Sequence, residues 1–206
     1  MAVPALDDGT IYYHSRMLGI LPEYQNRGLG LRLKLFQRSI ARRRGISHIR
    51  WTFDPLQSRN AWLNVVKLGC TSREYLPNLY GKNSSLFNAG LETDRLIAEW
   101  RIDRSPKCNA PPDRLPPPTI ESETGADGFR RPTGIRRVIG PRISLEIPEN
   151  IDALKRSSLA LARSWRLATR AAFQSAFRRG YVADGFLRRN DNGERRCFYL
   201  LSKRSR

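Results

Sequence analysis

The sequence predicts an α/β fold, and three observations lead to that prediction. Residues 10–102 alternate between strand periodicity and helix periodicity, in the order strand, helix, strand, helix, strand. Hydrophobic residues make up 40% of the 206 residues and include four Trp, eight Phe and seven Tyr, which suits a packed core. A helix that joins parallel strands makes a right-handed crossover, so these segments should form one layered unit.

The first strand is predicted over residues 10–21, which are rich in Ile, Tyr and Leu and stop before Pro22. A helix is predicted over residues 29–44, because apolar residues recur at helical spacing and three Arg precede Gly45. The apolar positions of this helix are Leu29, Leu33, Phe36 and Ile40. We expect this stripe to pack across the sheet.

The rest of this region is predicted as a strand stopped by Asp54-Pro55, a short helix closed by Gly69 and two closing strands. These segments cover residues 46–53, 58–68, 71–75 and 95–102. Because a helix joins them, the strands at 11–21 and 46–53 are expected to be neighbours in one sheet.

Composition divides the chain into three parts. Residues 1–102 form the α/β region, and residues 103–136 hold most of the prolines with three glycines, which predicts an irregular linker. Residues 137–206 predict a strand, a long helix from Ile151 to Arg179 and a β-hairpin. The helix carries a second stripe of Arg156, Arg163 and Arg170. We interpret this stripe as a solvated face, with a basic wall along a ligand groove as the alternative.

The net charge is +18, from 37 basic and 19 acidic residues. Such an excess favours polyanions, which include nucleic acid and a cofactor that carries phosphates. The basic residues are mostly Arg spread along the whole chain, which favours a solvated surface over one dedicated interface. Nucleic acid is therefore not favoured as a partner.

No stretch approaches the roughly 18 apolar residues of a membrane helix, and residues 1–8 do not form a signal peptide. We therefore expect no membrane partner. The three cysteines are widely spaced and form no metal-ligand pattern, so no metal is expected. They are Cys70, Cys108 and Cys197. Free thiols suit a reducing compartment, and we expect a cytoplasmic protein.

The most informative segment lies where the first strand passes into the first helix. Gln25, Gly28 and Gly30 stand there, and the two glycines have no side chain to block a ligand that approaches the backbone. The first helical turn supplies free N–H groups and the positive end of the helix dipole, which together suit a phosphate. Leu33 occupies the third glycine position of a dinucleotide-binding turn, so that motif is excluded. A structural tight turn is the alternative.

This segment resembles motif A of the GNAT superfamily of N-acetyltransferases, Gln/Arg-x-x-Gly-x-Gly/Ala after a strand. The resemblance implies a mixed sheet flanked by helices, here followed by a long helix and a hairpin. It also implies acetyl-CoA as co-substrate and a small-molecule or peptide amine as acceptor. Backbone amides of the loop would hold the pyrophosphate, from Arg27, Gly28, Leu29, Gly30 and Leu31. The strand end with Leu18 and Ile20 would pair with the pantetheine arm, and Asn60 would bond to it.

Further runs resemble a bacterial branch of predicted acetyltransferases, among them Trp51-Thr52-Phe53-Asp54-Pro55-Leu56 and Tyr75-Leu76-Pro77-Asn78-Leu79-Tyr80-Gly81. Two departures are evident. Fewer elements than usual precede the motif A strand, so we expect a chain truncated at its N-terminus, with an unpaired sheet edge that favours a homo-oligomer. At the position where many members carry a tyrosine acid, this chain has Val65.

The catalytic residues are therefore unassigned, and His14, Tyr75 and Tyr80 are the candidates. His14 could act as a base, and either tyrosine could supply a proton, although packing roles are the alternative for all three. Two other functions are open. The chain could be a non-catalytic protein that binds CoA, which Val65 favours, or a basic nucleic-acid-binding protein. Because of Val65 and the short N-terminus, we expect weak or absent transferase activity.

Overall fold

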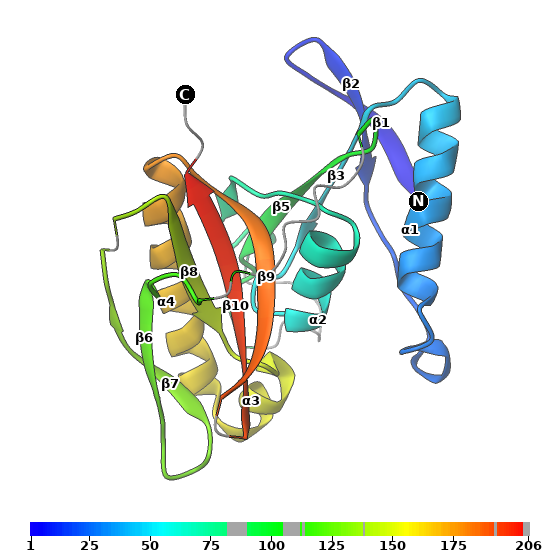
Figure 1. Ribbon diagram of the computed structural model, residues 1–206. Helices are drawn as coiled ribbons and strands as arrows, with labels where there is room; N and C mark the ends of the chain where they lie inside the picture. Colours follow the sequence, from blue (N-terminus) through cyan, green and yellow to red (C-terminus); the bar gives the residue numbers. More distant parts are fainter. Residues whose placement is uncertain (82–89, 105–111, 113, 138, 192, 204–206) are drawn as a thin grey trace.

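The computed structural model describes residues 1–81, 90–104, 112, 114–137, 139–191 and 193–203. Over these residues it is a mixed α/β structure with three sheets and four α-helices. The five-stranded sheet and α1 (Leu29–Arg43) lie at one end of the molecule, and the three-stranded sheet lies at the other (Figure 1). The predicted α/β class is confirmed. None of the described helices is long and apolar enough to cross a membrane.

The N-terminal sheet has the strand order β1-β2-β3-β5-β4. Its strands are β1 (Ala2–Asp7), β2 (Thr10–Ser15), β3 (His48–Phe53), β4 (Tyr75–Leu76) and β5 (Arg95–Arg101). Only β2 and β3 run parallel, and α1 joins them. The expectation that these two strands are neighbours in one sheet is therefore confirmed.

The first strand differs from its prediction at both ends. An additional strand, β1, precedes it and forms the sheet edge, where Pro4 is tolerated because an edge strand needs fewer donors. The strand predicted over residues 10–21 is wrong beyond Ser15. Arg16 N still donates to Met1 O at 3.1 Å, next to the last pair of the β1–β2 ladder, and after it a local bond forms in which Gln25 Nε2 donates to Ile20 O at 3.0 Å.

Helix α1 forms as predicted, but it buries a different face. Lys34 and Ala41 are its buried residues. Leu33 and Phe36 of the predicted apolar stripe are exposed, at 46% and 61%. The expectation that this stripe packs on the sheet is wrong, because the strand positions under the helix accept the Lys34 side chain instead. The exposed stripe lines an apolar groove between α1 and the β1–β2 hairpin.

The second helix begins as predicted, with α2 (Ser58–Ala61), and continues as a π-helical segment, η2 (Trp62–Lys67). Gly69 ends it with φ +70°, the left-handed region that favours glycine. The strand predicted over residues 71–75 is reduced to two bridges and β4. One bridge, Ser72 to Ala183, joins this region to the three-stranded sheet.

The C-terminal region is a three-stranded antiparallel sheet with the order β8-β10-β9, and α4 packs on it. Its elements are β8 (Arg142–Ile147), α3 (Ile151–Ser157), α4 (Leu159–Arg178), β9 (Tyr181–Asp191) and β10 (Glu194–Lys203). The predicted order of strand, helix and hairpin is confirmed. The single long helix is wrong, because Ser158 leaves helical geometry and caps α4 by accepting from Leu161 N at 3.2 Å.

The segment predicted as an irregular linker contains a β-hairpin, with β6 (Ile120–Thr124) and β7 (Arg130–Ile135). The signal for it was the Asp127-Gly128 pair, where Gly128 has φ +74° and its N–H donates to Gly125 O at 2.9 Å. Trp165 of α4 donates to Arg130 O at 2.8 Å and so fastens the hairpin to the helix. The remainder of the predicted linker lies partly outside the described residues.

Candidate functional site

The two parallel strands separate at their carboxyl ends. β2 and β3 pair only through Tyr13–Ile49 and His14–Arg50, and β2 ends at the next residue, Ser15. A cleft of ≈ 480 Å³ opens beyond this point, between the chain after β2 and the end of β3. Ligands of open α/β sheets bind at the carboxyl ends of parallel strands, so this cleft is the candidate site.

The β3 residues Trp51, Thr52 and Phe53 line the cleft, together with Asp54 directly after the strand. The chain after β2 supplies Leu18, and α2 supplies Asn60. The fold therefore brings these two predicted site residues into one cleft, although they are distant in sequence.

The segment after β2 offers free backbone groups to a ligand. Residues 16–21 are irregular, and the predicted strand end with Leu18 and Ile20 does not form. Within the described part of the chain, the backbone N–H groups of Leu18 and Gly19 have no hydrogen-bond partner. An extended ligand could pair with this backbone, as an added strand does.

The glycine turn closes one end of this segment. Asn26 and Gly28 both take left-handed backbone angles, with φ +62° and +74°. Gly28 is the N-cap of α1, so no side chain caps the first turn, and that turn holds no acidic residue. The free N–H groups of Leu29, Gly30 and Leu31 therefore remain open to an anion, with Arg27 beside them.

The turn and the cleft are adjacent. A Cβ on Gly30 would stand 3.6 Å from the Leu63 side chain and 3.7 Å from that of Ile20. Leu63 also lines the cleft. A ligand with phosphates at the turn could therefore extend directly into the space between the two strands.

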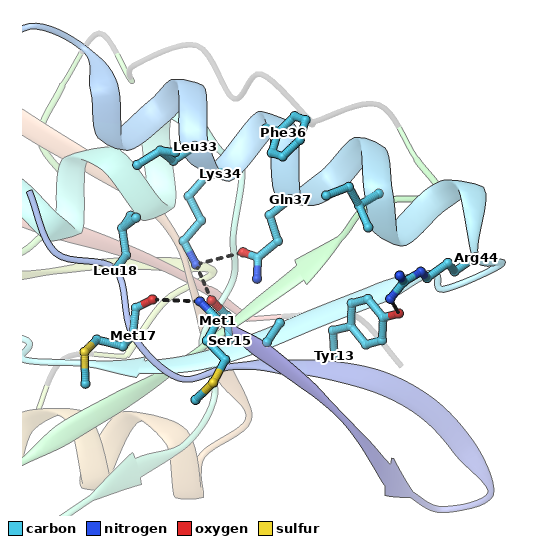
Figure 2. Close-up of a pocket in the computed structure, with 12 residues that line it drawn as sticks. Met1, Tyr13, Ser15, Met17, Leu18, Leu33, Lys34, Phe36, Gln37 and Arg44 are labelled. Carbon is cyan, nitrogen blue, oxygen red and sulfur yellow. Dashed lines mark hydrogen bonds between the residues drawn. The ribbon is translucent and has the colours of Figure 1, made fainter.

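Sequence reasoning missed the most unusual residue of the site. Lys34 is only 4% exposed and lies at the point where β2 and β3 separate. Its Nζ donates to Ser15 Oγ at 3.0 Å and to Gln37 Oε1 at 3.4 Å, as Figure 2 shows. The same nitrogen lies 3.5 Å from the centre of the Trp51 ring. Burial lowers the pKa of Lys34 to about 8, and electrostatic interaction with Cys70 opposes this shift.

Lysine on an amphipathic helix ordinarily indicates a solvated face, which is why sequence alone did not single out Lys34. The available signal was its position. Lys34 follows Gly30 by one helical turn and so projects along the side of α1 that faces the turn and the cleft.

The structure separates the three candidate acid–base residues. The Tyr75 hydroxyl donates to Asp94 Oδ2 at 2.6 Å, and burial raises the pKa of Tyr75 above its usual range. Its ring stacks on Phe173. Tyr75 is therefore held in the core and away from the cleft residues.

Tyr80 is closer to the cleft. Its hydroxyl lies 3.1 Å from Thr52 Oγ1, and Thr52 lines the cleft. The Arg95 guanidinium lies over the Tyr80 ring, 5.2 Å from its centre. The loop is fixed behind it, because Tyr80 N donates to Thr93 Oγ1 at 2.8 Å. Tyr80 is thus an exposed phenol held at the rim of the cleft.

The remaining residues have structural positions. His14 pairs with Arg50 on the β2–β3 ladder, before the strands separate, and does not line the cleft. Val65 is 6% exposed and belongs to the core. Cys70 and Cys197 are buried free thiols, as expected, whereas Cys108 lies outside the described residues. Burial raises the pKa of the Cys70 thiol beyond its usual range, which disfavours the nucleophilic thiolate.

The arginine stripe of the C-terminal helix is solvated at Arg156 and Arg163, as predicted, and half-buried at Arg170. Arg163 pairs with Glu92 at 2.8 Å, and Arg170 pairs with Asp94 at 2.7 Å. These intramolecular ion pairs use two of the three charges. Arg156 is exposed.

Comparison of the chain with protein-family models, with curated proteins and with solved structures found no match. Two features of the molecule bear on its function. One is the glycine turn at the start of α1, and the other is the cleft between β2 and β3 that the turn adjoins.

Proposed function

We propose that this chain is an N-acyltransferase of the GNAT type, which transfers an acetyl group from acetyl-CoA to an amine. The observation that carries the proposal is the position of the uncapped α1 N-terminus beside a cleft between two separating parallel strands. The helix N-terminus offers a site for the phosphates of CoA, and the cleft offers a channel for its extended pantetheine arm. The mixed sheet with helices agrees with the fold that the motif A resemblance implies.

The donor would lie along the segment from the turn to the cleft. Its pyrophosphate would accept from the N–H groups of residues 27–31, where neither a capping side chain nor an acidic residue competes. Its pantetheine arm would pair with the free backbone of Leu18 and Gly19, and Asn60 would face it from α2. The thioester would then reach the end of β3.

The reaction is a direct transfer. The lone pair of a neutral amine attacks the thioester carbonyl carbon, the C–N bond forms, and the C–S bond breaks. The departing thiolate takes up a proton, and the amine nitrogen loses one. Tyr80 is the proposed proton donor, because the residue is exposed and its hydroxyl lies 3.1 Å from Thr52 Oγ1, which belongs to the cleft lining.

The test is CoA binding by calorimetry for the wild type and for two glycine variants. Gly28→Val should weaken CoA binding about tenfold or more, because side-chain atoms would enter the phosphate site. Gly45→Val is the matched control. It lies at the other end of α1 with φ +73° against +74° for Gly28, and a Cβ meets nothing within 4 Å at either position.

The two variants carry the same backbone strain, so circular dichroism should show equal losses of stability. If CoA binds Gly28→Val and Gly45→Val equally well, the proposed site is wrong. Binding of CoA without thiol release from acetyl-CoA across a panel of amines would instead identify a non-catalytic CoA-binding protein.

A further inference from the structure

Lys34 is a buried amine, and no carboxylate in the described part of the chain pairs with it. Within the residues that the structure describes, its polar contacts are two neutral acceptors, Ser15 Oγ and Gln37 Oε1, and the face of Trp51. Buried lysines are normally paired with a carboxylate, because an ammonium loses much hydration energy when it leaves water. The absence of such a partner favours the neutral, nucleophilic amine.

The two hydrogen bonds also orient the amine. A neutral amine has two N–H groups, and Nζ has two acceptors, at 3.0 Å and 3.4 Å. Once both N–H groups are engaged, the lone pair remains free of protein donors. Lys34 lines both the cleft and the apolar groove between α1 and the β1–β2 hairpin, and Figure 2 shows its side chain among the residues that line the groove.

We propose that Lys34 Nζ is itself an acyl acceptor, so that the chain acetylates its own lysine from a thioester donor bound in the cleft. This inference rests on the proposed function and names one acceptor for it. The site is assigned by position, because Lys34 and Trp51 lie where β2 and β3 separate, and the donor arm would end there.

The step is balanced without a further reactant. The Nζ lone pair attacks the thioester carbonyl carbon, the N–C bond forms, and the C–S bond breaks. CoA leaves as a thiolate and takes up the proton that the nitrogen loses as it becomes an amide. The product is a neutral acetyl-lysine, which removes the cost of keeping an ammonium in this buried position.

Other ionisable groups share the two spaces with Lys34. The strands and the chain that follows them contribute Tyr13, Arg16, Asp54 and Arg95. The other parts of the chain contribute the Met1 amino group, Arg44, Asp152 and Lys155. The Cys70 thiol interacts electrostatically with Lys34 from the chain after η2. Lys155 provides an internal comparison, because it lines the same cleft but pairs with Asp152 at 2.7 Å.

The test is peptide mass spectrometry after incubation of the full chain with limiting acetyl-CoA at pH 8. We expect one acetyl group on the Lys34 peptide, at about tenfold or greater excess over Lys155 and Lys67, because burial lowers the pKa of Lys34 to about 8 and the donor arm would end beside its Nζ. Lys34→Arg should abolish the modification, and Lys67→Arg, at an exposed residue outside the cleft lining, should leave it unchanged. S-acetyl-N-acetylcysteamine, a thioester without the nucleotide, serves as a second donor.

The outcomes separate the two proposals. If calorimetry shows CoA binding and neither donor acetylates Lys34 above the level of Lys155, the self-acetylation is overturned and the proposed function stands. If CoA does not bind, both are overturned. Both proposals are supported if acetyl-CoA acetylates Lys34 in the wild type and in Gly45→Val, but not in Gly28→Val.

Discussion

Burial of Lys34 has a thermodynamic cost that can be measured apart from any activity. Its pKa is about 8 against the ordinary 10.5, a difference that corresponds to about 3 kcal/mol of stability. A variant without the amine would also lose the two hydrogen bonds of Nζ, at about 1 kcal/mol each, which reduces its gain in stability. The residue therefore resembles a functional group whose placement opposes stability.

We predict that Lys34→Met raises the free energy of unfolding by about 1–3 kcal/mol at pH 7. Below pH 8 the lysine is protonated in both states, so its cost is fully present. Between about pH 8 and 10.5 the unfolded chain holds the proton that the folded chain has released, so wild-type stability rises with pH. Urea unfolding measured from pH 7 to 10 should show that the difference in unfolding free energy between Lys34→Met and the wild type becomes smaller as the pH approaches 10.

Lys67→Met is the control for this experiment, because Lys67 is exposed. Its unfolding free energy should follow that of the wild type at each pH. If Lys34→Met is less stable than the wild type at pH 7, the hydrogen bonds of Lys34 and its Trp51 contact contribute more than the desolvation of its amine costs.

At the scale of elements, the C-terminal helices show how one polar residue divides a periodic segment. The apolar rhythm continues from Ile151 through Ala172, but Ser158 adopts φ −151° and ψ 104° and ends α3. Its hydroxyl then satisfies a free N–H of α4, which offsets the interruption. The bend allows α3 and α4 to pack against each other.

Ser158→Ala should therefore lower the unfolding free energy by about 1 kcal/mol, the usual contribution of an N-cap. Ser157→Ala is the matched control, since the adjacent serine is exposed and caps no helix; its effect should stay within about 0.5 kcal/mol. The measurement is urea denaturation monitored by Trp fluorescence. Equal effects of the two variants would contradict the capping role.

At the scale of the whole molecule, buried ion pairs join the N-terminal sheet to α4. Arg166 is 1% exposed and binds both oxygens of Asp54, at 2.8 Å and 2.7 Å. The Tyr199 hydroxyl donates to Pro55 O at 2.9 Å, from β10 to the chain after β3. One hydrophobic cluster spans both regions, so the chain should unfold in a single transition.

Asp54→Ala is expected to lower the unfolding free energy by about 3–5 kcal/mol, because it leaves the Arg166 charge buried without its main partner. The double variant Asp54→Ala/Arg166→Met should lose less than Asp54→Ala alone, since it removes the uncompensated charge as well. Thermal and urea unfolding of the three chains measure this. If Asp54→Ala is as stable as the wild type, the ion pair does not hold the two regions together.

Much of the fold could be predicted from local pattern. Alternation identified β3, helical spacing and Gly45 bounded α1, and turn residues marked the C-terminal hairpin, because each depends on neighbours within a few residues. The glycine turn was likewise readable, since φ +74° at Gly28 is a local requirement. Its use for acetyl-CoA remains a proposal.

The tertiary structure alone decided which side of α1 is buried, where β2 ends and which charges are paired. Lys34 is buried while Phe36 is exposed, which reverses the reading from periodicity, because the end of β2 offers Ser15 Oγ and β3 offers the Trp51 ring beneath the helix. The Arg166–Asp54 pair joins residues 112 positions apart. Such contacts cannot be predicted from local sequence, since they depend on how separate elements pack against each other.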